Sequence, residues 1–434
     1  MGFSRRIRVE RFLSLGLVLT VLSTIALAGE EDSAKPEDWE QRLEDLRSVP
    51  YVGLSEEPVE EHEAGLVLYD PDKSCDGYFL YNTRSSGEVL LLDVKGQVAH
   101  RWTYPPAREE GSPLAVHFGD HALLLENGDV IILSKFLELL RIDWNSNLLW
   151  KKELHPHHDV AAASDGTLYV IVRESEMYRG LKVKFPSIVH LTAGGLELDR
   201  WSSYARLSQM REAFDTRCFL DTYLDSALAS RKLEGKIAAR IRSARLSPEY
   251  YYDYFHMNAV SVLPANRAEE KDAIFRRGNL LTCFRNVNQI AVLERDTYQI
   301  LWVWGEGELQ WPHHPTMLQS GHILIFDNGV ERKYSRVMVL DPVQETIVWQ
   351  YVGDPPETFF SRDRGSAQRL PNGNTLICES NKGRVFQVTP EGEVVWNWLN
   401  PKLQYIGRGK PHRETVYRML YYSPEVVDPL LGRW

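Results

Sequence analysis

Two histidines stand at matching places in the sequence, each shortly before a polar turn. His158, in HHDVAAASDG, lies eight residues before Gly166, and His313, in HHPTMLQSG, lies eight residues before Gly321. Neutral imidazole is a nucleophile that forms covalent intermediates, and imidazole N–H groups stabilise anions. This spacing therefore predicts that two imidazoles from separate parts of the chain meet in one site.

A third segment carries related residues. In HMNAVSVLP, aligned on Leu263, the matching position is Asn258, and His256 lies two residues earlier on the same face of a strand. Arg285, in CFRNVNQIAVL, ends the inner or the next strand of the same unit. Converging cations and donors repel one another unless an anion joins them, so this set favours an oxyanion site.

A metal site is the competing interpretation, because five nearby side chains are acceptable ligands: His157, His158, Asp159, His313 and His314. Their spacing does not require a metal, and neighbouring residues on a strand point to opposite faces. We therefore predict no metal and no cofactor. The set also lacks the paired carboxylates of glycoside hydrolysis and the Ser-His-Asp order of acyl transfer.

The elements that position these residues form a repeat. Six segments run from a polar turn to a strand that ends in tryptophan, at Trp102, Trp150, Trp201, Trp302, Trp349 and Trp396. By subtraction the intervals are 48, 51, 101, 47 and 47 residues, and a four-stranded propeller blade has this period. The sequence therefore predicts an all-β, six-bladed β-propeller, with each tryptophan packed between blades.

In a propeller the innermost strands begin beside the central axis, so equivalent positions of separate blades converge there. The one long interval indicates a single blade with insertions rather than two blades. Residues 204–247 have helix-forming composition without strand alternation, which predicts a helical insertion in the fourth blade. We expect residues 65–434 to form the propeller, after a linker at 29–64 that contains a short helix.

The first 28 residues resemble an export signal. Four arginines precede an apolar stretch from Phe12 that ends in the small-residue pattern Ala26-Leu27-Ala28. Cleavage there predicts a periplasmic or secreted protein, and an uncleaved stretch would anchor it in the membrane. The four cysteines are far apart; one or two disulfides fit an oxidising compartment, and isolated core residues are the favoured expectation. The net charge of -10 argues against a nucleic-acid partner.

The ordered motifs of the chain resemble those of the arylsulfotransferase family. The similarity is strongest after residue 254, in HMNAVSVLP, CFRNVNQIAVLERDTYQILWVWG, WPHHPTMLQSGHILIFDNG, SRVMVLDPVQETIVWQY and GSAQRLPNGNTLICESNKGRVFQVTPEGEVVWNW. The earlier HHDVAAASDG continues it, so that it covers roughly residues 65–422. It implies an enzyme that transfers a sulfuryl group from a phenolic sulfate ester to a phenol, without a nucleotide donor.

The resemblance also implies roles for individual residues. His313 matches the histidine that becomes transiently sulfated, His256 and Arg285 match the residues that hold the sulfate, and His158 matches a histidine that lines the pocket. We expect Asn258, at the matching position of the third segment, to contribute to sulfate or substrate binding.

The chain departs from the family at two positions. Pro312 stands where the family commonly has Gln, and His314 stands where an acidic residue is usual. Both His313 and His314 are therefore candidates for the nucleophile. The alignment with His158 favours His313, and His314 is then a substrate-binding candidate.

Two other functions fit the same sequence. A propeller without catalytic activity that binds a ligand or a scaffold partner is one of them, since fold alone does not define function. A metal-dependent hydrolase is the other. For the transferase, the expected partners are a small-molecule aryl sulfate and a phenol, and no cofactor is expected.

Overall fold

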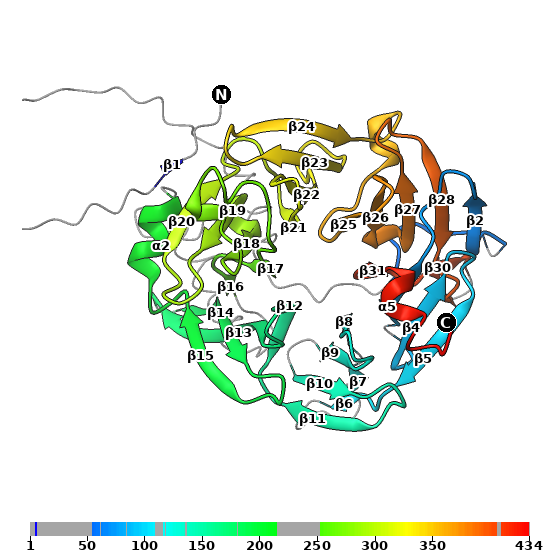
Figure 1. Cartoon of the computed structure of the whole chain (residues 1–434), viewed down its shortest axis with the longest axis horizontal. Helices are drawn as coiled ribbons and strands as arrows, with labels where there is room; N and C mark the ends of the chain where they lie inside the picture. Colours follow the sequence, from blue (N-terminus) through cyan, green and yellow to red (C-terminus); the bar gives the residue numbers. More distant parts are fainter. Residues whose placement is uncertain are drawn as a thin grey trace, which may run out of the picture.

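The computed structural model describes residues 5–6 and 54–433, except 61, 84, 109–115, 118, 135–136, 180, 215–251 and 406–408. Within these residues, six antiparallel sheets of four or five strands stand in a ring around a central axis (Figure 1). The predicted all-β, six-bladed propeller is therefore confirmed.

Each blade is given from its innermost to its outermost strand. Blade 1 is β31 (Met419–Tyr422), β3 (Tyr78–Asn82), β4 (Glu88–Asp93) and β5 (Val98–Thr103). Blade 2 is β8 (His121–Leu124), β9 (Val130–Ser134), β10 (Glu138–Ile142) and β11 (Leu148–Lys152). Blade 3 is β12 (Pro156–Ala162), β13 (Leu168–Tyr178), β14 (Leu181–Leu191) and β15 (Glu197–Ser202), with β16 (Tyr252–Asp253) parallel to β14.

The second half of the ring follows the same order. Blade 4 is β17 (Met257–Val262), β18 (Leu280–Phe284), β19 (Gln289–Leu293) and β20 (Ile300–Trp304), with β1 (Arg5–Arg6) beside β20. Blade 5 is β21 (Pro312–Met317), β22 (Ile323–Asp327), β23 (Arg336–Asp341) and β24 (Thr346–Tyr351). Blade 6 is β25 (Ser366–Arg369), β26 (Thr375–Glu379), β27 (Arg384–Val388) and β28 (Val394–Leu399), with β2 (Gly65–Tyr69) beside β28.

Strands from the two ends of the propeller close the ring. β31 follows blade 6 in sequence but is the innermost strand of blade 1, where Leu420 pairs with Leu80 of β3. β2 precedes blade 1 in sequence but lies at the outer edge of blade 6, where Leu66 pairs with Trp398 of β28. Blades 1 and 6 are thereby linked through both ends, which ties the ring shut and protects sheet edges.

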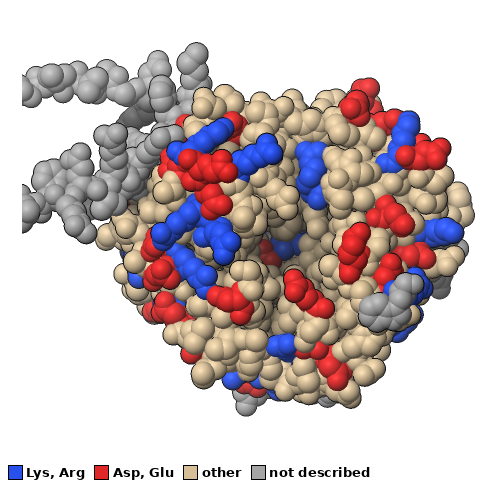
Figure 2. Space-filling model, viewed as in Figure 1, with Lys and Arg blue, Asp and Glu red and all other residues tan. Residues whose placement is uncertain are grey.

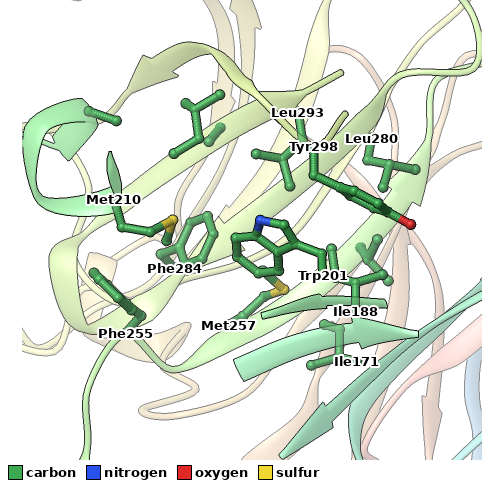
Figure 3. Packing of buried hydrophobic residues seen from close by; sticks show 14 of the residues in the cluster. Ile171, Ile188, Trp201, Met210, Phe255, Met257, Leu280, Phe284, Leu293 and Tyr298 are labelled. Carbon is green, nitrogen blue, oxygen red and sulfur yellow. The ribbon is translucent and has the colours of Figure 1, made fainter. Parts of the chain in front are cut away.

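The repeated tryptophans join neighbouring blades, as expected. The indole N–H of Trp150 donates to Ala193 O at 3.0 Å, in the β14–β15 turn of the next blade, and Trp396 donates to Val94 O at 2.7 Å. Trp201 of blade 3 packs in a buried cluster with Leu293 and Tyr298 of blade 4 (Figure 3). The interfaces between blades are therefore where most of the apolar core lies.

The predicted insertion is described only at its start. Helix α2 (Leu207–Phe214) buries Met210, Ala213 and Phe214 in the cluster between blades 3 and 4. Arg211 of the same helix donates to Tyr254 Oη at 2.9 Å, so the helix lies against the ring just before the site-bearing strand β17. The remainder of the predicted segment 204–247 lies outside the described residues.

The predictions for the amino terminus also lie largely outside the described residues, since only Arg5 and Arg6 of the first 28 are included. Among the residues that are described, no helix has the length and apolar character needed to cross a membrane. Cys75, Cys283 and Cys378 are buried free thiols, as expected of isolated core residues, and Cys218 falls in the undescribed part.

Candidate active site

The innermost strands of blades 3, 4 and 5 carry the predicted histidines where they begin. Backbone bulges interrupt β12, β17 and β21 near their starts, where the pairing register shifts. His158, His256 and His314 have positive φ angles of 64°, 51° and 46°. Such angles break the alternation of a regular strand, so successive side chains are no longer sent to opposite faces.

The ring of His313 is held at one nitrogen. Its Nδ1 lies 2.6 Å from Asn328 Oδ1 and 3.0 Å from Trp311 O. Asn328 is itself oriented, because its amide nitrogen donates to Ser361 O at 2.5 Å and to Arg364 O at 2.8 Å. Both partners of Nδ1 are acceptors, so Nδ1 carries the proton and Nε2 carries the lone pair.

That second nitrogen of His313 is the unusual one. Nε2 is buried and has no hydrogen-bond partner among the described residues. Buried polar atoms are almost always paired, so an unpaired one on an innermost strand indicates a place for a ligand atom. Burial, together with the positive charge of Arg285, lowers the pKa of His313 from 6.5 to about 3. The ring is therefore neutral at physiological pH and its Nε2 is nucleophilic.

Arg285 lies beside this ring, where the sequence predicted it. It begins the short 3-10 helix η2 (Arg285–Val287), and its backbone N–H donates to His256 O at 3.1 Å. Its guanidinium carbon lies 4.3 Å from the centre of the Trp311 ring, and its Nε donates to Asn286 Oδ1 at 3.2 Å. Stacking on Trp311 keeps this buried cation next to His313.

His158 and His256 face each other across the boundary between blades 3 and 4. Their Nε2 atoms are 2.9 Å apart. His158 Nδ1 lies 2.7 Å from Tyr417 Oη, and His256 Nδ1 lies 2.7 Å from Asp253 Oδ2. Burial raises the pKa of Asp253, but the charges of His256, Lys184 and Arg285 outweigh it and lower that pKa to about 2. A carboxylate therefore accepts from His256, which fixes the orientation of its ring.

Asn258 is fully buried one blade away from His313. Its amide nitrogen donates to Pro312 O at 2.8 Å, and its Oδ1 has no partner among the described residues. The amide hydrogens are thus directed at the backbone at the start of β21. The contact fixes the residue that precedes His313, which suits a positioning role better than a direct bond to sulfate.

His314 points into a second group of buried polar side chains on the same axis. Its Nδ1 donates to Ala367 O at 3.1 Å, and burial together with the charge of Arg418 holds its pKa well below the usual value. Arg418 pairs with Asp159 at 2.6 Å, and His121 Nε2 lies 3.5 Å from the same carboxylate. The structure thus places both adjacent histidines inside the ring, in different surroundings.

Sequence reasoning missed several of these partners, namely Asp253, Asn328, Tyr417, Arg418 and His121. His121 begins the innermost strand of blade 2, and Arg418 directly precedes the innermost strand of blade 1. The count of eight residues to a glycine, which identified His158 and His313, does not find these two positions: Gly128 follows His121 by seven residues, and Val426 is the eighth residue after Arg418. Both positions stand out instead by their place at the start of an innermost strand, and for Arg418 this place is known only once the carboxy-terminal strand is recognised as part of the first blade.

The expectation that His157 and His158 point to opposite faces is wrong. Their ring centres are 3.7 Å apart, and one nitrogen from each lies within 4.8 Å of the other and of a His256 nitrogen. The reason is the bulge in β12, where His158 has a φ of 64° and the strand loses its alternation.

Figure 2 shows that one face of the ring is hollowed at its centre, with basic and acidic atoms visible below the rim. Buried imidazoles, a stacked arginine and an imidazole nitrogen that has no partner in the described part of the chain thus lie at the inner ends of neighbouring blades. Such a site can hold an anion and offer it a nucleophile.

Comparisons with solved structures give matches of low sequence identity. A protein of unknown function from Bacteroides caccae is 13% identical, over 80% of this chain and 99% of that one, with a TM-score of 0.46. A streptogramin B lyase is 9% identical, over 87% of this chain and 97% of that one, with a TM-score of 0.42. A virginiamycin B lyase from Staphylococcus aureus is 12% identical, over 69% and 82%, with a TM-score of 0.35. These values are too low to support any inference about activity.

The comparison with protein families is more informative. No curated protein matches the chain. The family model described as arylsulfotransferase (ASST) matches residues 121–400, which is more than half of the chain and includes every site residue that the sequence predicted. On the strength of that match, the chain belongs to the arylsulfotransferase family.

Proposed function

We propose that this protein transfers a sulfuryl group from a phenolic sulfate ester to a phenolic acceptor, through a sulfated His313 and without a nucleotide donor. One observation carries the proposal. Two carbonyl oxygens hold the Nδ1–H of His313, which leaves a buried, unpartnered lone pair on Nε2 among the described residues. Membership of the arylsulfotransferase family supports a sulfuryl group as the one transferred.

In the first half-reaction, His313 Nε2 attacks the sulfur of the donor. The new N–S bond forms as the bond between sulfur and the aryl oxygen breaks, and the electron pair leaves with the phenolate. The sulfated ring keeps its Nδ1–H, and Asn328 Oδ1 accepts from it as positive charge develops. The guanidinium of Arg285 stabilises the non-bridging oxygens of the sulfuryl group. The His158–His256 pair contributes the N–H that is released when the bound donor breaks the contact between their Nε2 atoms.

In the second half-reaction, the oxygen of an acceptor phenol attacks the same sulfur. The N–S bond breaks, and its electron pair returns to His313 Nε2. The acceptor hydroxyl loses its proton to solvent, from which the phenolate released in the first half-reaction takes one up. A covalent intermediate of this kind divides one difficult transfer into two easier steps. The enzyme therefore needs neither a nucleotide nor an external base stronger than phenolate.

Two further residues take supporting roles in the proposal. Asn258 positions the start of β21, and hence His313, through its bond to Pro312 O. His314 contributes to substrate binding on the side of Arg418 through its Nε2, since its Nδ1–H is already bonded to Ala367 O. With an export signal expected in residues 1–28, the reaction is proposed to take place in the periplasm or outside the cell.

The test is a transfer assay with purified protein, a chromogenic aryl sulfate and a phenol acceptor. The proposal predicts release of the chromogenic phenol, together with formation of the sulfated acceptor in equal amount. Substitution His313→Ala should abolish both. Release of inorganic sulfate without sulfated acceptor would indicate a hydrolase instead, and tight donor binding without turnover would indicate a binding module.

A further inference from the structure

Three buried histidines from two blades bring their ring nitrogens close together. One nitrogen each of His157, His158 and His256 lies within 4.8 Å of the other two. The three rings are in mutual contact, with centres 3.7 Å apart for His157 and His158, 4.8 Å for His158 and His256, and 5.4 Å for His157 and His256. In the proposed transfer reaction His157 has no role, so its place in this group is unexplained.

The outer nitrogens of two of these rings are held as they are in metal sites. His256 Nδ1 lies 2.7 Å from the carboxylate of Asp253, and His158 Nδ1 lies 2.7 Å from the hydroxyl of Tyr417. Metal-binding histidines commonly bond a carboxylate, a carbonyl or a similar group through the nitrogen that does not bind the ion. Both rings consequently direct Nε2 toward the same point.

The dimensions of the cluster are near those of a three-histidine site. Zinc binds imidazole nitrogen at about 2.0–2.1 Å, so nitrogens at tetrahedral corners are about 3.3–3.4 Å apart. To bind zinc, the Nε2 atoms of His158 and His256, which are 2.9 Å apart, have to move slightly apart. The ring nitrogens that are separated by up to 4.8 Å have to move closer together. Small rotations of the imidazole rings can make both changes while His256 Nδ1 keeps its contact with Asp253 and His158 Nδ1 keeps its contact with Tyr417.

The geometry points to a divalent transition-metal site of the zinc class formed by His157, His158 and His256, with Asp253 and Tyr417 orienting two of the ligands. Imidazole ligands suit zinc, copper, iron and nickel ions rather than calcium or magnesium. Three protein ligands leave a fourth position for water or, if the proposed sulfuryl transfer holds, for a sulfate oxygen of the donor. The cations Lys184 and Arg285 are close enough to Asp253 to lower its pKa. They also repel a metal ion bound nearby, so we expect weaker binding than in a three-histidine site without cations around it.

The site is tested by titrating zinc into the full-length protein after treatment with a chelator and dialysis, with isothermal calorimetry as the readout. Wild type should bind one zinc ion per chain. His157→Ala should weaken binding at least tenfold, and Asp253→Asn should weaken it by about 10- to 100-fold. His322→Ala is the matched control, because His322 lies half-buried in the β21–β22 turn, and it should bind like wild type.

A second measurement uses wild-type protein alone, so its result does not depend on whether the variants fold. Addition of cobalt to chelator-treated wild type should give the visible absorption of a tetrahedral cobalt centre, and zinc should displace it. Absence of both the calorimetric signal and the cobalt spectrum in wild type would overturn the site. Equal affinity of folded His157→Ala and wild type for zinc would overturn it as well.

The outcome is separable from that of the proposed function, because zinc and cobalt binding are measured without donor or acceptor. Stoichiometric metal binding without any transfer activity would support the metal site and remove the transferase. Full transfer activity in protein that binds neither ion would support the transferase and remove the metal site.

Discussion

His313 and His314 are neighbours in the chain and both are buried, yet they lie in opposite kinds of surroundings. His313 presents an unpartnered Nε2, within the described residues, beside the stacked cation Arg285. His314 donates its Nδ1–H to Ala367 O and lies on the side of the Asp159–Arg418 ion pair. In both rings burial and a nearby arginine keep the imidazole neutral.

Neutrality alone therefore does not make a histidine a nucleophile. What distinguishes His313 is that two acceptors, Asn328 Oδ1 and Trp311 O, fix its proton on Nδ1, whereas Ala367 O is the one acceptor of His314 Nδ1 among the described residues. The Nε2 of His313 is also fully buried. The hydrogen-bond partners of each ring, rather than its burial or the direction of its pKa shift, therefore separate the two candidates.

The largest expected effect comes from replacing the two histidines one at a time. His313→Asn should lower the rate of sulfuryl transfer by about four orders of magnitude or more, because it removes the attacking atom. His314→Asn should lower it less than about tenfold, mainly through KM, because asparagine still donates to Ala367 O. Steady-state transfer assays on both variants check this, and a larger loss in His314→Asn would reverse the assignment.

The next effect concerns the partner that fixes the proton. Asn328→Ala should lower kcat by about 10²- to 10³-fold with KM nearly unchanged, because His313 then samples the tautomer with its proton on Nε2. Since Asn328 also bonds Ser361 O and Arg364 O, thermal unfolding must be measured in parallel. A kcat within twofold of wild type in folded Asn328→Ala would show that tautomer control is unimportant.

The third prediction uses pH to examine Arg285. In wild type the low pKa of His313 keeps its ring neutral down to acid pH, so His313 should cause no loss of activity between pH 7 and 5. Arg285→Gln removes a charge that lowers this pKa, so the acid limb of the pH profile should move to higher pH. The same variant should lose about 10²-fold in kcat, since a donor to the sulfuryl oxygens is gone. An unshifted acid limb would contradict the electrostatic role.

The smallest expected effect is on stability. His121, His313 and His314 all have folded-state pKa values below the ordinary 6.5. Below that pH the unfolded chain takes up protons that the folded chain does not, so acidification lowers the free energy of unfolding. The slope approaches about 1.4 kcal/mol per pH unit for each histidine. Urea denaturation at several pH values should give a shallower acid dependence for His314→Asn than for wild type; equal slopes would be inconsistent with a neutral buried His314.

Much of the architecture could be predicted from the sequence, because a blade repeats its turn and its tryptophan at a readable period. The spacing of His158 and His313 also located the start of the innermost strands, since counting back from a turn preserves position along a strand. Counting residues back from a turn does not reveal a β-bulge. It therefore gave a wrong orientation for His157 relative to His158, where a positive φ angle removes the alternation.

The partners of the site could not be predicted, for a different reason. Tyr417 is separated from His158 by 259 positions and precedes a strand that joins the first blade, so the fold has to close before the two can meet. Asp253 and Asn328 are only 3 and 15 positions from the histidines they contact, but no repeated pattern marks them. Residue type alone does not identify them, because asparagine, aspartate and tyrosine are common at turns and strand ends. The structure of the closed propeller is needed to see which imidazole nitrogen each of these residues contacts.

The most direct measurement is the location of a covalent adduct. The protein is incubated with an aryl sulfate donor in the absence of acceptor, and its intact mass and peptide masses are then recorded. The account predicts a gain of one SO3 group per chain, carried by His313 and lost when a phenol is added. Transfer that proceeds with no adduct, or with the group on His314 or another residue, would contradict it.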